Sequence, residues 1–264
     1  MDSLLPPFED PEIRETTERG HQQSDESRAV LLLSSGLDST SLFCLATDYY
    51  DEIQPIFFRY GNLAQDVEEK QSHNLVDWVQ ANVDGCDVQD LMVVDLQEQF
   101  SQLIDSPTTV SGRDVDEHDH TVGYVPMRNL IFISLASSFA TNHGYRDVLI
   151  GDSLGDFMTG TPVSNPTALV RGTYTYLISQ VTQIASAKGD VVVRAPLIDA
   201  RITYEESAQL LSERGWPLEF SYSCFEISDP DNPEPCGECS TCQDRIGAFE
   251  DAGCIDPLLM GEDE

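Results

Sequence analysis

One stretch decides the fold: Ala29-Val30-Leu31-Leu32-Leu33-Ser34-Ser35-Gly36-Leu37-Asp38-Ser39-Thr40. Its apolar run is typical of a buried strand, and a helical pattern follows directly after the small residues. Small residues let the backbone approach a ligand, and hydroxyls, amide N–H groups and a helix N-terminus all favour phosphate. The stretch therefore predicts a phosphate-binding turn, in which Asp38 caps the helix or helps to hold Mg²⁺. An ordinary strand-to-helix turn, capped by Asp38 or Ser39, is the competing interpretation.

The alternation of strand and helix continues along the chain. We expect further strands at 53–58, 91–94, 147–151 and 191–194, and helices at 39–48, 64–81, 127–142, 167–187 and 203–214. Apolar strands that alternate with helices form a parallel sheet covered on both faces, so the predicted fold is α/β, a doubly wound parallel sheet. Ligands of such sheets bind at the carboxyl ends of the strands, where loops 34–39, 59–61 and 151–153 should converge.

The charge of the chain indicates its environment. The 264 residues include 47 acidic and 14 basic side chains, which gives a net charge of −33 at pH 7. The acids are spread along the chain, and molar salt shortens the Debye length to about 3 Å, so we interpret the charge as adaptation to a salt-rich cytoplasm. A nucleic-acid mimic is the alternative. Because binding to a nucleic-acid backbone needs clustered Lys and Arg, no direct binding to nucleic acid is expected.

No segment of the sequence is typical of a membrane protein or a secretory signal. The longest apolar run, 130–136, has the length of a core helix, and the acidic N-terminus lacks a basic segment followed by an apolar one. We therefore expect a cytoplasmic protein with no membrane partner.

Four cysteines near the C-terminus predict a metal site: Cys224, Cys236, Cys239 and Cys242. Two-residue gaps let successive thiolates face one centre, and tetrahedral Zn²⁺ is the natural occupant of four sulfurs. Such a closed site has a structural role. An iron–sulfur cluster and a redox Cys-x-x-Cys remain alternatives.

These features divide the chain into three parts. We expect a disordered acidic tail at 1–27, a nucleotide-binding domain at 28–220 and a zinc-binding region at 221–264. Cys44, Cys86 and Cys254 have the character of packing residues. His118, Asp119 and His120 suggest either a second metal site or a solvated acidic loop.

Loop and cysteines together resemble a known family. Residues 34–39 resemble the Ser-Gly-Gly-x-Asp-Ser pyrophosphate loop (PP-loop) of ATP pyrophosphatases. Three further segments are similar to 7-cyano-7-deazaguanine synthases: Val125-Pro126-Met127-Arg128-Asn129, Ala195-Pro196-Leu197-Ile198, and the run from Ser223-Cys224-Phe225 to Arg245. The similarity extends from about residue 29 to 253, and the cysteine pattern makes it specific.

The resemblance implies an ATP-dependent carbon–nitrogen ligase of the queuosine and archaeosine precursor pathway. Such an enzyme converts 7-carboxy-7-deazaguanine and ammonia into the nitrile through an acyl-adenylate and an amide, with Mg²⁺ and Zn²⁺ bound. Asp38 and Arg128 would be catalytic, and the substrate would contact Arg128, Asn129, Gly151 and Asp152. The nucleotide would lie on seven loop residues, which are Ser34, Ser35, Gly36, Leu37, Asp38, Ser39 and Thr40. The family also implies a homodimer.

Several residues depart from the family pattern. Ser35 replaces the first glycine of the loop, a change that a negative φ would tolerate. Tyr60-Gly61-Asn62-Leu63-Ala64 stands where the family has Tyr-Gly-Gln-Arg-His, and residues 152–160 lack the family's deazaguanine segment. Two alternatives follow: a paralogue that joins the acid to another amine, such as the terminus of a protein partner, or a nucleotide-binding subunit without turnover. A tRNA-thiolating relative fits the acidic surface less well.

Overall fold

The computed structural model describes residues 27–103, 125, 127–152, 169–186, 191–226 and 228–259. Of residues 169–174 it describes the backbone alone. The expected acidic tail, the His118–His120 loop, Pro126 and the departures at 153–160 lie outside the described residues.

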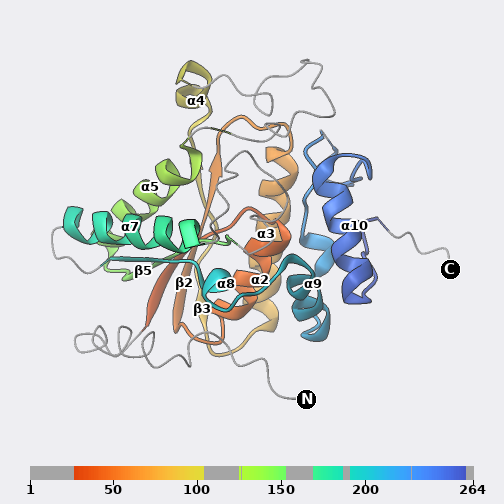
Figure 1. The fold of residues 1–264 in the computed structure, drawn as a ribbon, viewed down its shortest axis with the longest axis horizontal. Helices are drawn as coiled ribbons and strands as arrows, with labels where there is room; N and C mark the ends of the chain where they lie inside the picture. The colour runs from red at the N-terminus through yellow and green to blue at the C-terminus, as the bar shows by residue number, and fades with distance from the viewer. Residues whose placement is uncertain are drawn as a thin grey trace.

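A six-stranded parallel sheet forms the centre of the molecule (Figure 1). Its order is β3-β2-β1-β5-β6, with β4 also paired to β2. The strands are β1 (Arg28–Leu32), β2 (Glu52–Arg59), β3 (Asp87–Val88), β4 (Met92–Asp95), β5 (Asp147–Leu149) and β6 (Val192–Arg194). The chain runs outward from β1 to β2 and then returns to place β5 on the other side of β1. The doubly wound parallel sheet is thus confirmed, and its topological switch point lies between β1 and β5.

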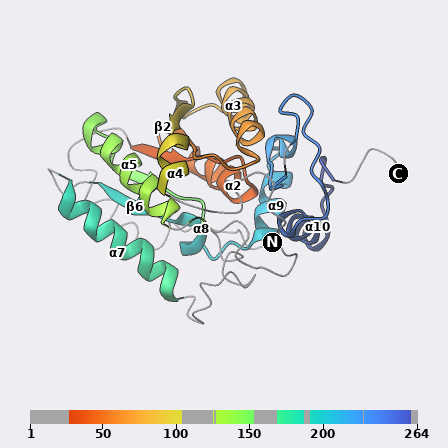
Figure 2. The same ribbon diagram turned by 90° about the horizontal axis from the view of Figure 1, so that it is seen from above.

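Helices cover both faces of the sheet, as Figure 2 shows from above. Helices α2 (Leu37–Ala46), α3 (Gln65–Asn82) and α9 (Tyr204–Glu213) share one core with alternate residues of β1, such as Leu31. Helices α5 (Arg128–His143) and α7 (Leu169–Ala185) lie on the opposite face, where Val30 belongs to the second core. This alternation explains why β1 is apolar throughout, because both of its faces are buried.

Five further elements of the described residues were not expected from the sequence. They are α4 (Gln97–Leu103), α8 (Pro196–Asp199), the 3₁₀ turn η2 (Leu218–Phe220) and α10 (Ser240–Ala252), besides β3. Helix α10 packs on α9, away from the sheet, at the right of Figure 1. None of the helices within the described ranges combines the length and the apolar character that crossing a bilayer requires.

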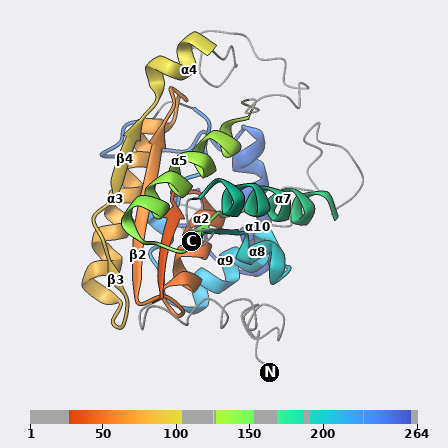
Figure 3. The ribbon, with the colours of Figure 1, turned by 90° about the vertical axis from the view of Figure 1, so that its left-hand side faces the viewer.

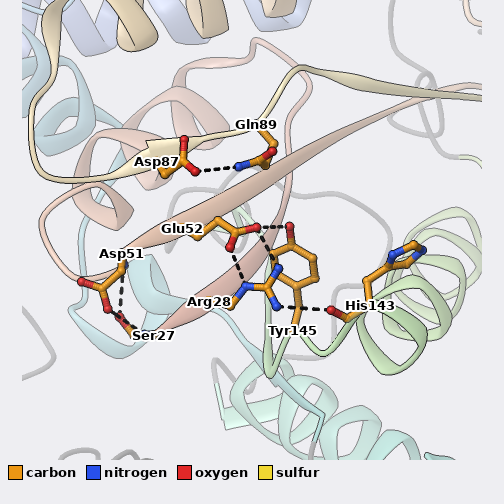
Figure 4. A network of polar contacts seen from close by, with 8 residues as sticks. All are labelled: Ser27, Arg28, Asp51, Glu52, Asp87, Gln89, His143 and Tyr145. Atoms are coloured by element: carbon orange, nitrogen blue, oxygen red, sulfur yellow. Dashed lines mark hydrogen bonds and ion pairs between the residues drawn. The ribbon is translucent and has the colours of Figure 1, made fainter. Parts of the chain in front are cut away.

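The amino ends of the strands are joined by a polar network, which Figure 4 shows from close by. Arg28 donates to both carboxylate oxygens of Glu52, at 2.6 and 2.9 Å, and lies over the Tyr145 ring. The Tyr145 hydroxyl also donates to Glu52. Hydrogen bonds from Arg28 lower the pKa of Glu52, so the carboxylate stays ionised. This network joins β1 to β2 and to the start of β5 at the edge opposite the phosphate loop.

Candidate active site and metal centre

The phosphate loop lies at the carboxyl end of β1 and leads into α2. The N-cap of α2 is Gly36, with φ −58° and ψ 157°, and no side chain caps the helix. The Ser39 hydroxyl instead bonds within the loop: it donates to the Gly36 carbonyl at 3.0 Å and accepts from the Ser34 N–H at 3.3 Å. Capping by Asp38 or Ser39 is therefore wrong. Since N–H groups of the first helical turn have no acceptor inside the helix, this geometry suits an anion.

Ser35 corrects one expectation from the sequence. Its φ is +55°, not negative, so it keeps the left-handed conformation that a glycine would adopt more easily. Its carbonyl accepts from the Thr40 hydroxyl at 3.3 Å and from the Tyr222 N–H at 2.9 Å. These two contacts hold the peptide in place, and the Ser35 hydroxyl is buried without a hydrogen-bond partner.

The seven predicted nucleotide residues differ in accessibility. Leu37 and Thr40 are fully buried, at 1% and 0% exposure, so only their backbone can meet a nucleotide. Ser34 is exposed and Asp38 partly so. The Asp38 carboxylate accepts from the Ser207 hydroxyl of α9 at 3.4 Å, which places it in the first turn of α2 on the side that faces α9.

Arg128 begins α5 and faces the same edge of the sheet. Its guanidinium donates to the Tyr60 hydroxyl at 3.1 Å and to the side-chain oxygen of Asn129 at 3.1 Å. Burial alone would lower the pKa of Arg128, but Tyr60, Glu68 and Asp152 raise it above its ordinary value. The side chain is therefore a fixed cation between the end of β2 and the end of β5.

Gly151 and Asp152 follow β5 at this edge. A Cβ atom on Gly151 would lie 2.9 Å from the Ser39 Cα, so only glycine allows the end of β5 to approach the start of α2. Packing thus explains Gly151, and its contact with substrate stays a prediction. Asp152 is partly buried and acts electrostatically on Arg128.

The four C-terminal cysteines converge as the sequence predicts. Their Sγ atoms all lie within 4.8 Å of one another, and those of Cys236 and Cys242 are 3.9 Å apart. Four sulfurs about 2.3 Å from one tetrahedral ion would lie about 3.8 Å apart, so the set fits a single metal ion. Backbone N–H groups of Glu226 and Cys236 point at the Cys224 sulfur, at 3.3 and 3.4 Å, and would stabilise a thiolate. Gly237, with φ +71°, makes the turn between the first two ligands of the closely spaced group.

The cysteine unit is anchored to the rest of the protein. Tyr222, Cys224 and Cys242 share a small core with Ala64 and Val67 at the start of α3. Behind it, the buried guanidinium of Arg245 binds Asp256 through two bonds of 2.6 and 2.9 Å and the Ser221 hydroxyl at 3.0 Å. The bond to Ser221 ties α10 to the segment that carries Tyr222, and the ion pair with Asp256, whose side chains are both almost fully buried, ties α10 to the residues that follow it.

Two residues of the site had not been predicted from the sequence. Glu68 of α3 acts electrostatically on Arg128, and the N–H of Tyr222 donates to the Ser35 carbonyl in the phosphate loop. The sequence offered a signal for Glu68, because it lies one helical turn before Ser72, on the face of α3 that buries Ser72, Val76 and Val79. The sequence offered no signal for Tyr222, because its hydrogen bond to Ser35 joins two segments that lie far apart along the chain.

Fold and site together define an α/β nucleotide-binding protein of the PP-loop type that carries a four-cysteine metal centre. A family model described as "Queuosine biosynthesis protein QueC" matches residues 28–253. The chain therefore belongs to the QueC family.

Relatives named 7-cyano-7-deazaguanine synthase match nearly the whole chain. The Aquifex aeolicus protein is 33% identical over 83% of this chain and 95% of its own. The Oceanobacillus iheyensis protein is 31% identical (88% and 97%), and that of Haloarcula marismortui is 30% identical (90% and 97%). The structure of the U34-tRNA thiolase NcsA from Methanococcus maripaludis with its [4Fe-4S] cluster is similar with a TM-score of 0.45, at 15% identity over 91% of this chain and 74% of that one.

Proposed function

We propose that the protein converts 7-carboxy-7-deazaguanine and ammonia into 7-cyano-7-deazaguanine at the expense of ATP. The observation that supports this most directly is family membership over residues 28–253, together with a phosphate loop at the switch point of the sheet. The shared name of the relatives favours this reaction over a paralogue that uses another amine.

The charge and the position of each residue suggest its role in the reaction. A carboxylate becomes a good electrophile only when its oxygen joins the α-phosphate of ATP, and pyrophosphate leaves. The backbone at Ser34–Ser39 would hold the phosphates, and Asp38 would help to hold Mg²⁺, which neutralises phosphate charge when bound. Arg128 would bind the developing charge or the acid, with Asn129 and Asp152 beside it. Catalysis by this set rests on positioning and on charge neutralisation.

Zn²⁺ is the ion that we propose for the four cysteines. Sulfur atoms within 4.8 Å of one another favour one ion over a cubane cluster, in which each thiolate binds a different iron and the thiolates lie further apart. The closed set of four ligands leaves no vacant position for substrate, so the ion would be structural. Metal analysis of protein purified without added metal tests this assignment.

Self-association is proposed on the α5–α7 face. Segments 127–146 and 157–189 contain no acidic residue in a chain of net charge −33. Large apolar side chains are exposed on the described parts of these helices, which are Leu135, Tyr176, Leu177, Val181 and Ile184. In a salt-rich cytoplasm, the location we propose from the charge, this face allows two acidic copies to meet without like charges opposed. Light scattering in molar salt would then give the mass of a homodimer.

An assay of three products tests the reaction itself. In molar salt with ATP and Mg²⁺, the acid and ammonia should yield pyrophosphate, AMP and a product with the mass of the nitrile. Pyrophosphate that appears only when a protein amine is added would contradict the proposal. ATP binding without pyrophosphate would identify a subunit that lacks turnover.

A further inference from the structure

A small polar cluster lies beside Arg128. The Asn62 amide donates to the Glu68 carboxylate at 3.0 Å, and the Glu68 carboxylate interacts electrostatically with the Arg128 guanidinium. Asn62 is 93% buried, since its exposure is 7%, and its side-chain oxygen has no hydrogen-bond partner. A buried amide oxygen without a donor is costly, and it indicates a place where a donor arrives with a ligand.

The sheet order places this cluster next to the reacting groups. Because β1 lies between β2 and β5, the phosphate loop lies between the loop that carries Tyr60 and Asn62 and the residues after β5. Arg128 donates a hydrogen bond to Tyr60, after β2, and also interacts electrostatically with Asp152, after β5, so its guanidinium lies at the edge of the sheet where β1 ends. A carboxylate that faces Arg128 is therefore close to the position where the phosphate loop presents the α-phosphate.

The proposed reaction needs a base at this position. When ammonia attacks the acyl-adenylate, a C–N bond forms, the C–O bond to AMP breaks and its electron pair leaves with AMP. The new amide nitrogen must lose one proton. When the amide oxygen then attacks a second ATP, pyrophosphate leaves and nitrogen loses a second proton. When the C–O bond to AMP breaks, its electron pair leaves with AMP, and nitrogen loses its third proton to give the nitrile.

We propose that Glu68 is the general base that takes these protons. In the same proposal, the side-chain oxygen of Asn62 accepts a hydrogen bond from an N–H of the incoming ammonia. The inference rests on the proposed function. Arg128 would hold the adenylate on the other side of the same carbon, so attack and departure take place between the two charged groups. Glu68 is partly exposed and can pass each proton on to water.

The electrostatic surroundings suit this role. Burial raises the pKa of Glu68 to about 7, against the smaller opposing effects of the Asn62 hydrogen bond and the Arg128 charge. Tyr60 also faces the pair, and its own pKa is raised by burial, so it stays neutral. The neighbouring acids of α3, Asp66 and Glu69, pair instead with Arg59. A base whose pKa lies near the working pH is efficient in proton transfer.

The test separates the adenylation from the attack of the amine. Pyrophosphate release from ATP and 7-carboxy-7-deazaguanine without amine reports adenylation. Hydroxylamine then traps the adenylate as a hydroxamate. It is used in place of ammonia because it is largely neutral at pH 7, whereas ammonia is mostly protonated there. Glu68→Gln keeps the shape and the bond from Asn62, and Glu69→Gln is the matched control with the same change of charge one residue further.

For Glu68→Gln we expect adenylation within about twofold of the wild type and hydroxamate formation slower by about 10²-fold. The wild-type rate should fall as the pH drops through about 7, where the carboxylate becomes protonated, and this limb should vanish in the variant. Glu69→Gln should keep both the rate and the limb. Equal loss of both steps with a raised KM for the acid would instead make Glu68 a binding residue, and an unchanged hydroxamate rate would exclude it as the base. Wild-type protein that releases no pyrophosphate would overturn the proposed function, and the inference with it.

Discussion

The phosphate loop and the cysteine unit differ in what holds them in place. The loop joins a strand and a helix that are almost completely buried, and its shape follows from packing such as the contact of Gly151 with Ser39. The cysteine unit has a small core, with Tyr222, Cys224 and Cys242 as its buried members from the C-terminal segment. The zinc ion that we propose for the four cysteines would contribute about 10–16 kcal/mol to such a unit. Apolar burial therefore shapes the reactive edge, and metal ligation shapes the region that supports it.

A backbone hydrogen bond links the two regions, and Phe249 of α10 also belongs to the core that contains Leu37 of α2. The Tyr222 N–H, two residues before the ligand Cys224, donates to the Ser35 carbonyl at 2.9 Å. The cysteine unit thus supports the phosphate loop from behind without lending it a reactive group. Each change below weakens one region and is expected to leave the other intact.

Cys242→Ser should have the largest effect, because Cys242 is a fully buried ligand. We expect loss of bound zinc, and with it several of the roughly 10–16 kcal/mol of metal-coupled folding. Limited proteolysis should then cut within 221–259 while the sheet resists. Cys254→Ser, outside the ligand set, is the control that keeps its zinc. Equal protease sensitivity of both regions would show that they fold as one unit.

Arg245→Met should destabilise the protein by about 3–5 kcal/mol, because it leaves the Asp256 carboxylate buried without its cation. Denaturant unfolding in molar salt measures the change. The control is Arg214→Met, which breaks the exposed pair with Asp48, and it should cost about 0–1 kcal/mol. Similar losses in the two variants would contradict the anchoring role of Arg245.

Glu52→Gln should cost about 1–2 kcal/mol at neutral pH, since it removes the ionic partner of Arg28 at the far edge of the sheet (Figure 4). The pKa of Glu52 is lowered in the folded protein, so its contribution is complete above the ordinary glutamate pKa and is lost as the pH falls through the lower folded value. The difference in unfolding free energy between variant and wild type should therefore shrink below about pH 4. A difference independent of pH would refute the charge argument.

Ser35→Gly should have the smallest effect and the opposite sign. Glycine adopts φ +55° without strain and removes a buried hydroxyl that has no partner, so a gain of about 1 kcal/mol is expected. Thermal unfolding measures it. Destabilisation would mean that the hydroxyl makes a contact that the strain argument omits.

Sequence reasoning worked best where local patterns and burial agree. The apolar run of β1 and the spacing of the four cysteines predicted the sheet and the metal site, because each depends on neighbours along the chain. Helix α10 was missed because it starts inside the cysteine pattern and carries few apolar residues. The positive φ of Ser35 could not be predicted from the sequence, because the hydrogen bond that fixes the Ser35 carbonyl comes from Tyr222, in a distant segment of the chain. The role of Glu68 could not be predicted for the same reason, because it depends on the charge of Arg128 in α5, which is distant along the chain. Figure 3, in which the left-hand side of the molecule faces the viewer, shows α5 and α7 in front of the sheet and α10 behind it.

The central claim is that the phosphate loop performs the chemistry and the cysteine unit only supports it. Asp38→Asn tests it most directly, because the isosteric amide keeps the contact with Ser207 but removes the charge. Pyrophosphate release and zinc content are measured on the same sample. We predict that pyrophosphate release falls by about 10²-fold or more while about one zinc ion per chain remains. Loss of zinc together with pyrophosphate, or pyrophosphate release that persists, would contradict the account.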